Sequence, residues 1–210
     1  AQPMEQSLQE APAPMHELPA TSPEVRPEKA IQDGKILYFD LETLRSAEEV
    51  GGWENTAKMG MSVGVVFEEG RGEYRTYREA DVERLLLDLV TADRVIGFNI
   101  DRFDLSVLSG YTRWDLGKIR TFDMLGYIYS KLGFRLKLHA LAETTLGERK
   151  SADGLQALAW VKEGRFDLIE EYCRKDVGVT RSLHRFGVTN RFLLYHDQER
   201  RKVRLPVEWS

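Results

Sequence analysis

Apolar residues are arranged in two different ways along this chain, and the change between them predicts where strands and helices form. From about residue 35, short apolar runs alternate with segments whose apolar residues recur at helical spacing. The short runs are rich in strand-forming residues and too brief for helices, so they predict strands. They cover residues 35–39, 59–67, 73–77, 94–98 and 118–122.

Six segments have the spacing or the boundary residues of helices. Residues 79–91 are the clearest, because Val82, Leu85 and Leu89 recur at helical spacing. Asp123 is placed to cap the helix that follows it. The predicted helices are 79–91, 105–108, 123–132, 139–145, 154–162 and 166–186. Three strands followed by a helix, a strand and mostly helices predict an α/β fold, in which helices flank a mixed sheet.

The two ends of the chain differ from its middle. Residues 1–30 contain six of the seven prolines and no aromatic residue, which is typical of a disordered or extended tail; an arm packed on the body is the alternative. We expect residues 1–33 to form a tail or linker and 34–210 to form one domain. Residues 200–209 are basic and then extended, so they predict a late edge strand, with a phosphate-contacting arm as the alternative.

Apolar content and cysteine usage indicate the compartment. Hydrophobic residues make up 42% of the 210 residues, and the longest apolar runs are far too short to cross a membrane. The first 30 residues lack the basic start and apolar stretch of a signal peptide. The single cysteine, Cys173, has no partner for an internal disulfide. These features predict a cytoplasmic protein.

The net charge of −4 argues against tight, non-specific coating of duplex DNA, which needs many Lys and Arg residues. Most of that charge lies in residues 1–30, which carry a net charge of −3. If other acids bind metal ions, the surface around them becomes locally positive. A nucleic-acid substrate is therefore not excluded.

Carboxylates in three separate segments are the candidate chemistry. Asp40 and Glu42 are two residues apart at the end of a predicted strand, so both side chains point to one face. Asp104, with Asp101 as its competitor, follows the strand at 94–98 and starts the next helix. The alternatives are a solvated strand end for the pair and a helix N-cap for Asp104. Two adjacent carboxylates repel each other unless a cation or proton lies between them.

The last helix supplies a tyrosine and a further aspartate. Tyr172 and Asp176 are four residues apart and share one helix face. An exposed surface pair is the alternative. This helix has many apolar residues, however, and an aspartate on a largely buried helix needs a partner such as a metal ion.

Oxygen ligands without a Cys or His cluster favour Mg²⁺ or Mn²⁺ over zinc, and none of the four histidines has zinc-site spacing. Two such ions about 3.5–4 Å apart would stabilise the attacking and leaving oxygens of an in-line phosphoryl displacement. No covalent intermediate is needed. Cys173 is therefore expected to be a small buried hydrophobic residue and not a nucleophile.

In this order, the motifs resemble those of the DEDD superfamily of 3′→5′ exonucleases, which have a ribonuclease H-like (DnaQ-like) fold with a five-stranded mixed sheet. The first motif is Asp40 with Glu42, the second is Asn99-x-x-x-Phe103-Asp104, and the third is Tyr172-x-x-x-Asp176. The tyrosine resembles the DEDDy branch, because the histidine branch would have His where Glu171 stands. Within this branch, residues 34–190 most resemble the stand-alone or helicase-associated bacterial proteins of the YprB-like type.

The resemblance implies a role for each motif residue. Asp40, Glu42 and Asp176 would hold the metal ion that activates water, and Asp40 and Asp104 would hold a second ion at the leaving oxygen. Tyr172 would align the attacking water. The residues expected to contact the terminal nucleotide are Leu41, Thr43, Asn99 and Phe103. Asn99 could otherwise cap or hold the loop, and Phe103 could belong to the core.

A nuclease of this kind would release nucleoside 5′-monophosphates from a nucleic acid with a free 3′ end. Single-stranded DNA is favoured by analogy, since the tyrosine branch includes DNA proofreading domains. The alternatives are an RNA 3′→5′ exonuclease and a catalytically silent nucleic-acid-binding module of a larger helicase or polymerase assembly.

Two further features have open interpretations. Trp53, in the loop after the first motif, could stack on a nucleobase or could be a loop aromatic that caps the core. Arg149 and Lys150 could contact phosphate or could be a solvated basic pair.

Overall fold

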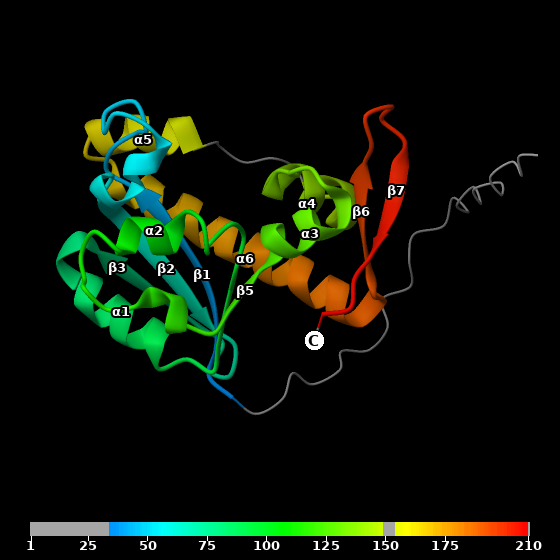
Figure 1. The fold of residues 1–210 in the computed structure, drawn as a ribbon, viewed down its shortest axis with the longest axis horizontal. Coiled ribbons are helices and arrows are strands. Elements are labelled where there is room, and N and C mark those ends of the chain that lie inside the picture. The colour runs from blue at the N-terminus through cyan, green and yellow to red at the C-terminus, as the bar shows by residue number, and fades with distance from the viewer. Residues whose placement is uncertain (1–33, 149–153, 210) are drawn as a thin grey trace, which may run out of the picture.

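A five-stranded mixed sheet forms the centre of the structure, a computed structural model that describes residues 34–148 and 154–209 (Figure 1). The strand order is β3-β2-β1-β4-β5. Strand β1 pairs with β4 in parallel, β4 pairs with β5 in parallel, and β2 is antiparallel to both β1 and β3. The strands are β1 (Ile36–Thr43), β2 (Met61–Glu68), β3 (Glu73–Arg78), β4 (Arg94–Gly97) and β5 (Thr121–Asp123). The predicted α/β class is confirmed, and the sheet is consistent with a ribonuclease H-like fold.

Two strands differ most from their predicted bounds. The first was expected at residues 35–39, but β1 continues to Thr43, because Asp40 pairs with Val65 and Glu42 with Val63 of the neighbouring strand. Backbone pairing, and not the apolar character of the residues, therefore extends the strand past its two acidic residues. The last was expected at 118–122, but β5 begins only at Thr121, since a 3₁₀ turn, η3 (Leu116–Lys118), precedes it.

The helices follow the predicted order. They are α1 (Val82–Val90), α2 (Asp104–Leu108), α3 (Met124–Leu132), α4 (Leu138–Leu146), α5 (Gly154–Lys162) and α6 (Phe166–Asn190), with 3₁₀ helices η1 (Trp53–Lys58) and η2 (Glu79–Asp81). The predicted cap of α3 is confirmed, because the Asp123 side chain accepts a hydrogen bond from the Gly126 backbone N–H. Helix α6 continues four residues beyond the predicted end at 186 and stops where Arg191 adopts a left-handed conformation.

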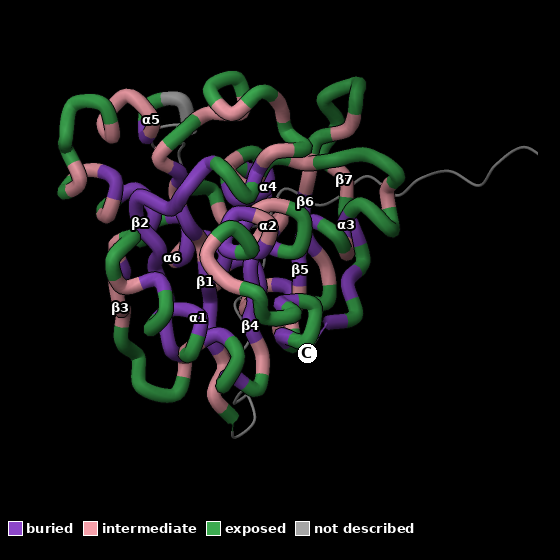
Figure 2. Tube along the Cα trace, turned by 60° about the vertical axis from the view of Figure 1, so that its left-hand side comes forward, coloured by how far each residue is buried: buried purple, intermediate pink, exposed green. Residues whose placement is uncertain are grey.

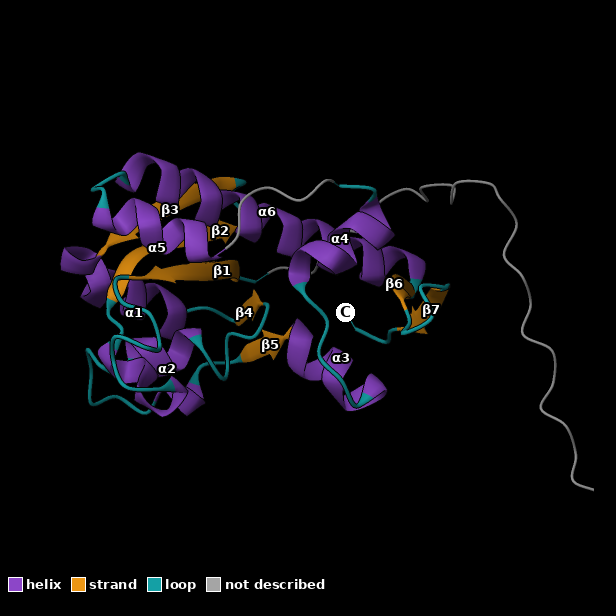
Figure 3. Cartoon of the chain, turned by 90° about the horizontal axis from the view of Figure 1, so that it is seen from above, coloured by secondary structure: helices purple, strands orange, loops and turns teal. Residues whose placement is uncertain are grey.

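Helices cover both faces of the sheet. Helices α1 and α2 lie on one side, and α5 and α6 lie on the other (Figure 3). Buried residues follow β1, β2 and β4 through the middle of the molecule (Figure 2). Along β1 the two faces alternate: Phe39 and Leu41 belong to the core beneath α1 and α2, and Tyr38 belongs to the core beneath α6. Asp40 and Glu42 share the side of Tyr38 and therefore face α6.

The C-terminal region forms a separate two-stranded ribbon. Strand β7 (Lys202–Pro206) pairs antiparallel with β6 (Phe192–His196), beyond the C-terminal half of α6 (Figure 1). The predicted edge strand at 200–209 is thus a strand, but its partner is β6 and not the central sheet. After it, Trp209 is buried against Gly187 of α6.

Several sequence predictions lie outside the described residues, namely those for the tail (1–33) and for Arg149 and Lys150. Within the described ranges, no helix is both long enough and apolar enough to cross a membrane.

Candidate metal site

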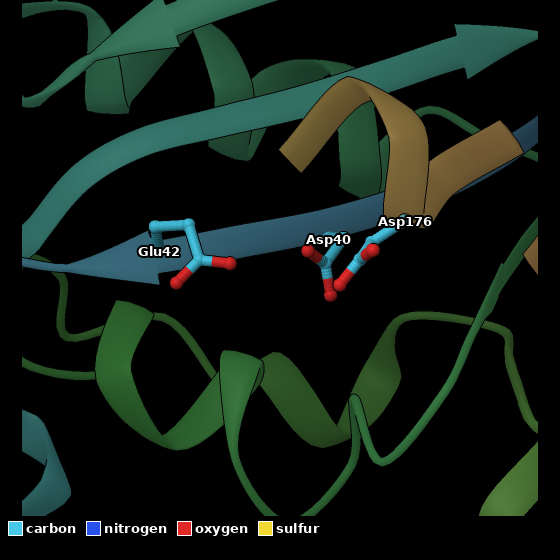
Figure 4. Close-up of side chains that lie close together, drawn as sticks. All are labelled: Asp40, Glu42 and Asp176. Carbon is cyan, nitrogen blue, oxygen red and sulfur yellow. The ribbon is translucent and has the colours of Figure 1, made fainter. Parts of the chain in front are cut away.

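Three carboxylates from two distant segments converge at the carboxyl end of β1. Asp40 and Glu42 come from the strand, and Asp176 comes from α6. One oxygen of each lies within 4.8 Å of the others. Figure 4 shows the side chains of Asp40 and Asp176 next to each other and that of Glu42 reaching in from further along the strand. Of the four acids predicted to bind metal, the structure brings these three together.

Local packing explains how α6 places its aspartate over β1. Cys173 is fully buried and lies three residues before Asp176, on the side of the helix that contacts the strand. Its Sγ lies 3.3 Å from the Asp40 carbonyl oxygen and 3.5 Å from Asp40 Oδ2. Burial, and next the charge of Asp40, raise the pKa of this thiol well above its ordinary value. Cys173 is therefore the small buried residue predicted from the sequence.

The fourth acid, Asp104, contacts the same strand at the residue between the two acids. It begins α2, it is buried, and its Oδ1 accepts a hydrogen bond of 3.0 Å from the Leu41 backbone N–H. Its oxygens do not belong to the group within 4.8 Å. Asp101, the competing acid, is exposed, and its backbone N–H donates to Asp123 Oδ2. The structure therefore places Asp104, and not Asp101, beside β1.

The loop between β4 and α2 is held by Asp123, which the motifs did not include. Asn99 has a φ of 73°, a left-handed conformation, and its backbone N–H donates to Asp123 Oδ1 at 2.8 Å. At Gly97, a Cβ atom would lie 2.9 Å from the Phe39 carbonyl oxygen, so a side chain would push the loop off β1. The Asn99 side chain accepts a 2.6 Å hydrogen bond from Arg135.

Tyr172 lies beside the carboxylates, within a group of aromatic rings. It is buried, and its ring centroid is 6.3 Å from that of Trp160 and 6.4 Å from that of His139. Burial raises the pKa of its phenol, and the negative charges of Asp176 and Glu42 raise it further. The hydroxyl therefore stays protonated at neutral pH and can donate a hydrogen bond.

Burial raises the pKa of every acid at this site, and repulsion from neighbouring site acids raises it further at Asp40 and Glu42. The pKa values of Asp40 and Glu42 lie well above their ordinary values, because both groups are desolvated and both face other carboxylates. Burial raises the pKa of Asp104 to about 7 and that of Asp176 to about 6. Each acid is therefore destabilised in its charged form while no cation is bound.

A hard divalent cation fits this donor set. Carboxylate oxygens are the ligands that Mg²⁺ and Mn²⁺ prefer. The buried Oδ1 of Asp176 has no hydrogen-bond partner among the described residues, so a bound cation would satisfy it. A bound ion would also relieve the repulsion among the three charges.

The predicted nucleotide-contacting residues lie on β1 and in the loop before α2, and those on β1 are buried. Leu41 and Thr43 are buried, with exposed fractions of 3% and 8%, and the Leu41 side chain belongs to the core beneath α2. Phe103 is half-buried and packs against the same core. Asn99 is half-buried in the loop already described.

Sequence reasoning missed three residues near the acids. The Nε2 of His139, on α4, lies 3.4 Å from Asp176 Oδ1. Asp123 was expected only as a helix cap, but it also holds the Asn99 loop, and Arg135 contacts Asn99. Asp123 had a detectable signal, since the carboxyl ends of parallel strands meet at one edge of a sheet. His139 and Arg135 had none, because only the tertiary packing brings them there.

Comparison with known proteins adds no relative to this picture: no family model matches the chain, and neither does any curated protein.

Proposed function

We propose that this protein is a metal-dependent 3′→5′ exonuclease that hydrolyses phosphodiester bonds at nucleic-acid 3′ ends. The supporting observation is the convergence of Asp40, Glu42 and Asp176 within 4.8 Å, with Tyr172 one helical turn before Asp176. The order of these residues along the chain is that of the DEDDy motifs. Carboxylates on a central strand and a helix packed over it suit phosphoryl transfer by bound metal ions.

Asp40, Glu42 and Asp176 would hold one divalent ion, Mg²⁺ or Mn²⁺. Such ions, when bound, acidify a water molecule and neutralise charge on the phosphate oxygens. The protein contributes a rigid frame, because Asp40 and Glu42 are paired with β2 in a strand whose first residues, 36–38, are also paired with β4. Rigid ligands keep the reacting groups aligned without reorganisation.

Asp104 would join Asp40 at a second ion, directly or through water. Its Oδ1 is fixed by the Leu41 N–H, which leaves Oδ2 for this contact. That hydrogen bond also connects α2 to the peptide between the two acids of β1. The charge of Asp104 raises the pKa of Asp40, so the two carboxylates are close enough to interact.

Tyr172 would orient the attacking water and would not act as a base. A base needs a pKa near the working pH, whereas burial raises the pKa of this phenol. The protonated hydroxyl can hold a water molecule in line with the phosphorus. Trp160 and His139, whose rings pack beside the phenol ring, limit its rotation.

The preferred substrate in this proposal is single-stranded DNA with a free 3′ end, and RNA is the alternative. A helicase or polymerase is the partner that such a nuclease would serve. A catalytically silent binding module would keep the fold and lose the reaction.

The test uses the purified protein with single-stranded DNA and RNA, each labelled at the 3′ or the 5′ end. Reactions contain Mg²⁺, Mn²⁺ or EDTA, and Asp104→Ala and Asp40→Asn serve as inactive variants. We expect stepwise shortening from the 3′ end, release of nucleoside 5′-monophosphates, and no reaction in EDTA or with either variant. The polymer that is degraded faster, DNA or RNA, is the preferred substrate.

Two outcomes would contradict the proposal. Wild-type turnover by either variant would show that these carboxylates do not carry the reaction. No cleavage of DNA or RNA in either metal would favour the silent binding module.

A further inference from the structure

The side chain of Trp53 is mostly exposed, at 71%, and lies next to the proposed active site. Its ring packs against Phe103, with centroids 6.2 Å apart and planes tilted by 59°. Phe103 precedes Asp104, whose Oδ1 is bonded to the backbone of β1. One ring contact and one hydrogen bond thus connect Trp53 to the strand that carries Asp40 and Glu42. Its exposure excludes the interpretation of Trp53 as a cap on the core.

The exposure of Trp53 is fixed by ordered backbone. The preceding Gly51 and Gly52 have φ values of 86° and 130°, conformations that side chains rarely adopt. The Gly52 N–H donates to the Ala47 carbonyl at 2.7 Å. Upstream, Ser46 and Glu49 exchange side-chain-to-backbone hydrogen bonds of 2.7 and 3.2 Å. The chain therefore holds the indole in solvent and does not leave it on a loose loop.

The helical turn that begins with Trp53 is anchored to the same element as the fourth acid. Thr56 of η1 is buried, and its hydroxyl is hydrogen-bonded to that of Ser106 in α2. This bond resists movement of η1 relative to α2. The backbone that carries Trp53 is consequently held close to the element that begins with Asp104.

We propose that Trp53, together with Phe103, is a stacking platform for an unpaired nucleobase near the 3′ end of the substrate. This inference rests on the proposed function and specifies the form of nucleic acid that the site accepts. Aromatic stacking is tolerant of sequence, because every base has a π face. A base in a duplex is already paired and stacked, so the platform favours single-stranded or frayed ends.

The test measures binding separately from hydrolysis. A 5′-fluorescein oligothymidylate with phosphorothioate linkages at its 3′ end, which slow turnover, is titrated with wild type, Trp53→Ala and Trp53→Phe in Mg²⁺, and anisotropy gives the Kd. Trp114→Ala is the matched control. Trp114 is also exposed, at 51%, but it comes after the C-terminal end of α2, whereas Asp104 begins that helix. We expect Trp53→Ala to raise the Kd about tenfold, Trp53→Phe to restore most of the affinity, and Trp114→Ala to change nothing.

Abasic oligonucleotides distinguish stacking from a structural role. Removing a single base at successive positions from the 3′ end should raise the Kd of wild type at the stacked position, by about the factor seen for Trp53→Ala. The same removal should leave the Kd of Trp53→Ala unchanged. If Trp53 had only a structural role, removing a base would raise the Kd of Trp53→Ala by the same factor as that of wild type at every position. That result would overturn the inference.

Other outcomes separate this inference from the proposed function. Binding that depends on Trp53, without cleavage of an unmodified oligonucleotide, would support the platform and contradict the nuclease. If Trp53→Ala cleaves the substrate with unchanged Kd and KM, the stacking platform is overturned and the proposed nuclease is not. Trp53 would then be an exposed residue for contact with a protein. Absence of oligonucleotide binding by wild type would also overturn the platform.

Discussion

The Nε2 of His139 lies 3.4 Å from Oδ1 of Asp176, and both atoms are buried without a hydrogen-bond partner among the described residues. The contact joins α4 to α6 at the metal-site aspartate. Burial raises the pKa of Asp176, and the neighbouring His139 lowers it, so the two effects oppose each other. We interpret His139 as a positioning residue that limits rotation of the Asp176 carboxylate.

His139→Ala should weaken metal binding by roughly tenfold, because groups that orient metal ligands typically contribute factors of 10–100. A Mg²⁺ titration followed by the shift in melting temperature measures this without requiring activity. His196→Ala is the control, since His196 is exposed on β6 and its Nδ1 contacts Thr144. An unchanged Mg²⁺ midpoint in His139→Ala would contradict the positioning role.

Asp104→Asn should stabilise the metal-free protein at neutral and alkaline pH. The pKa of Asp104 is about 7 in the folded chain against an ordinary 3.8, so folding favours the protonated acid. Its stabilising contribution is present below its ordinary pKa and is lost as the pH rises through about 7. The asparagine keeps the shape without the charge.

Thermal melts of both proteins in EDTA, from about pH 5 to about pH 8, measure this difference. The melting temperature of wild type should fall relative to Asp104→Asn as the pH rises. Burial lowers the pKa of His184 to about 4, so this residue makes both proteins less stable as the pH falls. Because both proteins contain His184, its effect cancels in the difference between their melting temperatures. A constant difference across this range would refute the predicted titration.

Mg²⁺ or Mn²⁺ should raise the melting temperature of wild type, more at about pH 8 than at about pH 5, because the ligand carboxylates must lose their protons to bind metal. EDTA should reverse the effect. Asp40→Asn should remove most of it, and Asp101→Asn, in an exposed acid of the neighbouring loop, should retain it. Equal metal stabilisation of wild type and Asp40→Asn would place the ion elsewhere.

Tyr172→Phe should lower the rate of hydrolysis by one to two orders of magnitude, a typical range for losing one group that positions a reactant. The Mg²⁺ midpoint should stay close to that of wild type, because the phenol is not among the metal-binding oxygens. Single-turnover assays across a Mg²⁺ series measure both quantities. Loss of metal binding in this variant would instead make Tyr172 a structural support of the site.

Gly187→Ala should destabilise the fold by about 1–3 kcal/mol, the usual cost of overpacking a core. A Cβ at this position would overlap the indole of Trp209. Gly126→Ala is the matched control in α3, since its Cβ would meet no atom closer than 3.5 Å. Urea unfolding of both variants gives the comparison, and equal stabilities would show that Trp209 moves aside freely.

The sequence predicted much of the fold because local patterns dictate much of it. Short apolar runs and helical apolar spacing located every strand of the central sheet and the six α-helices of the described residues to within a few residues. The apolar run ends at Phe39, so the sequence placed the two acids at the end of the strand but not the full length of β1 to Thr43, which pairing with β2 specifies. Strand β6 was missed for a similar reason: its partner β7 is needed to define it.

The periods of strands and helices predict which residues of one element share a face, but they do not predict contacts between elements. Asp40 with Glu42, and Tyr172 with Asp176, follow from the strand and helix periods alone. The contact of His139 with Asp176 depends on how α4 packs on α6, for which the chain carries no local signal.

The position of Cys173 has a practical consequence for following the motions of this protein. It is the only cysteine in the sequence, and its sulfur is enclosed between α6 and the backbone of Asp40. A thiol-reactive dye can reach it only when helix and strand separate. The labelling rate of the unmodified protein therefore reports how often the two halves of the carboxylate cluster come apart, and a bound cation or nucleic acid that clamps them together will slow it.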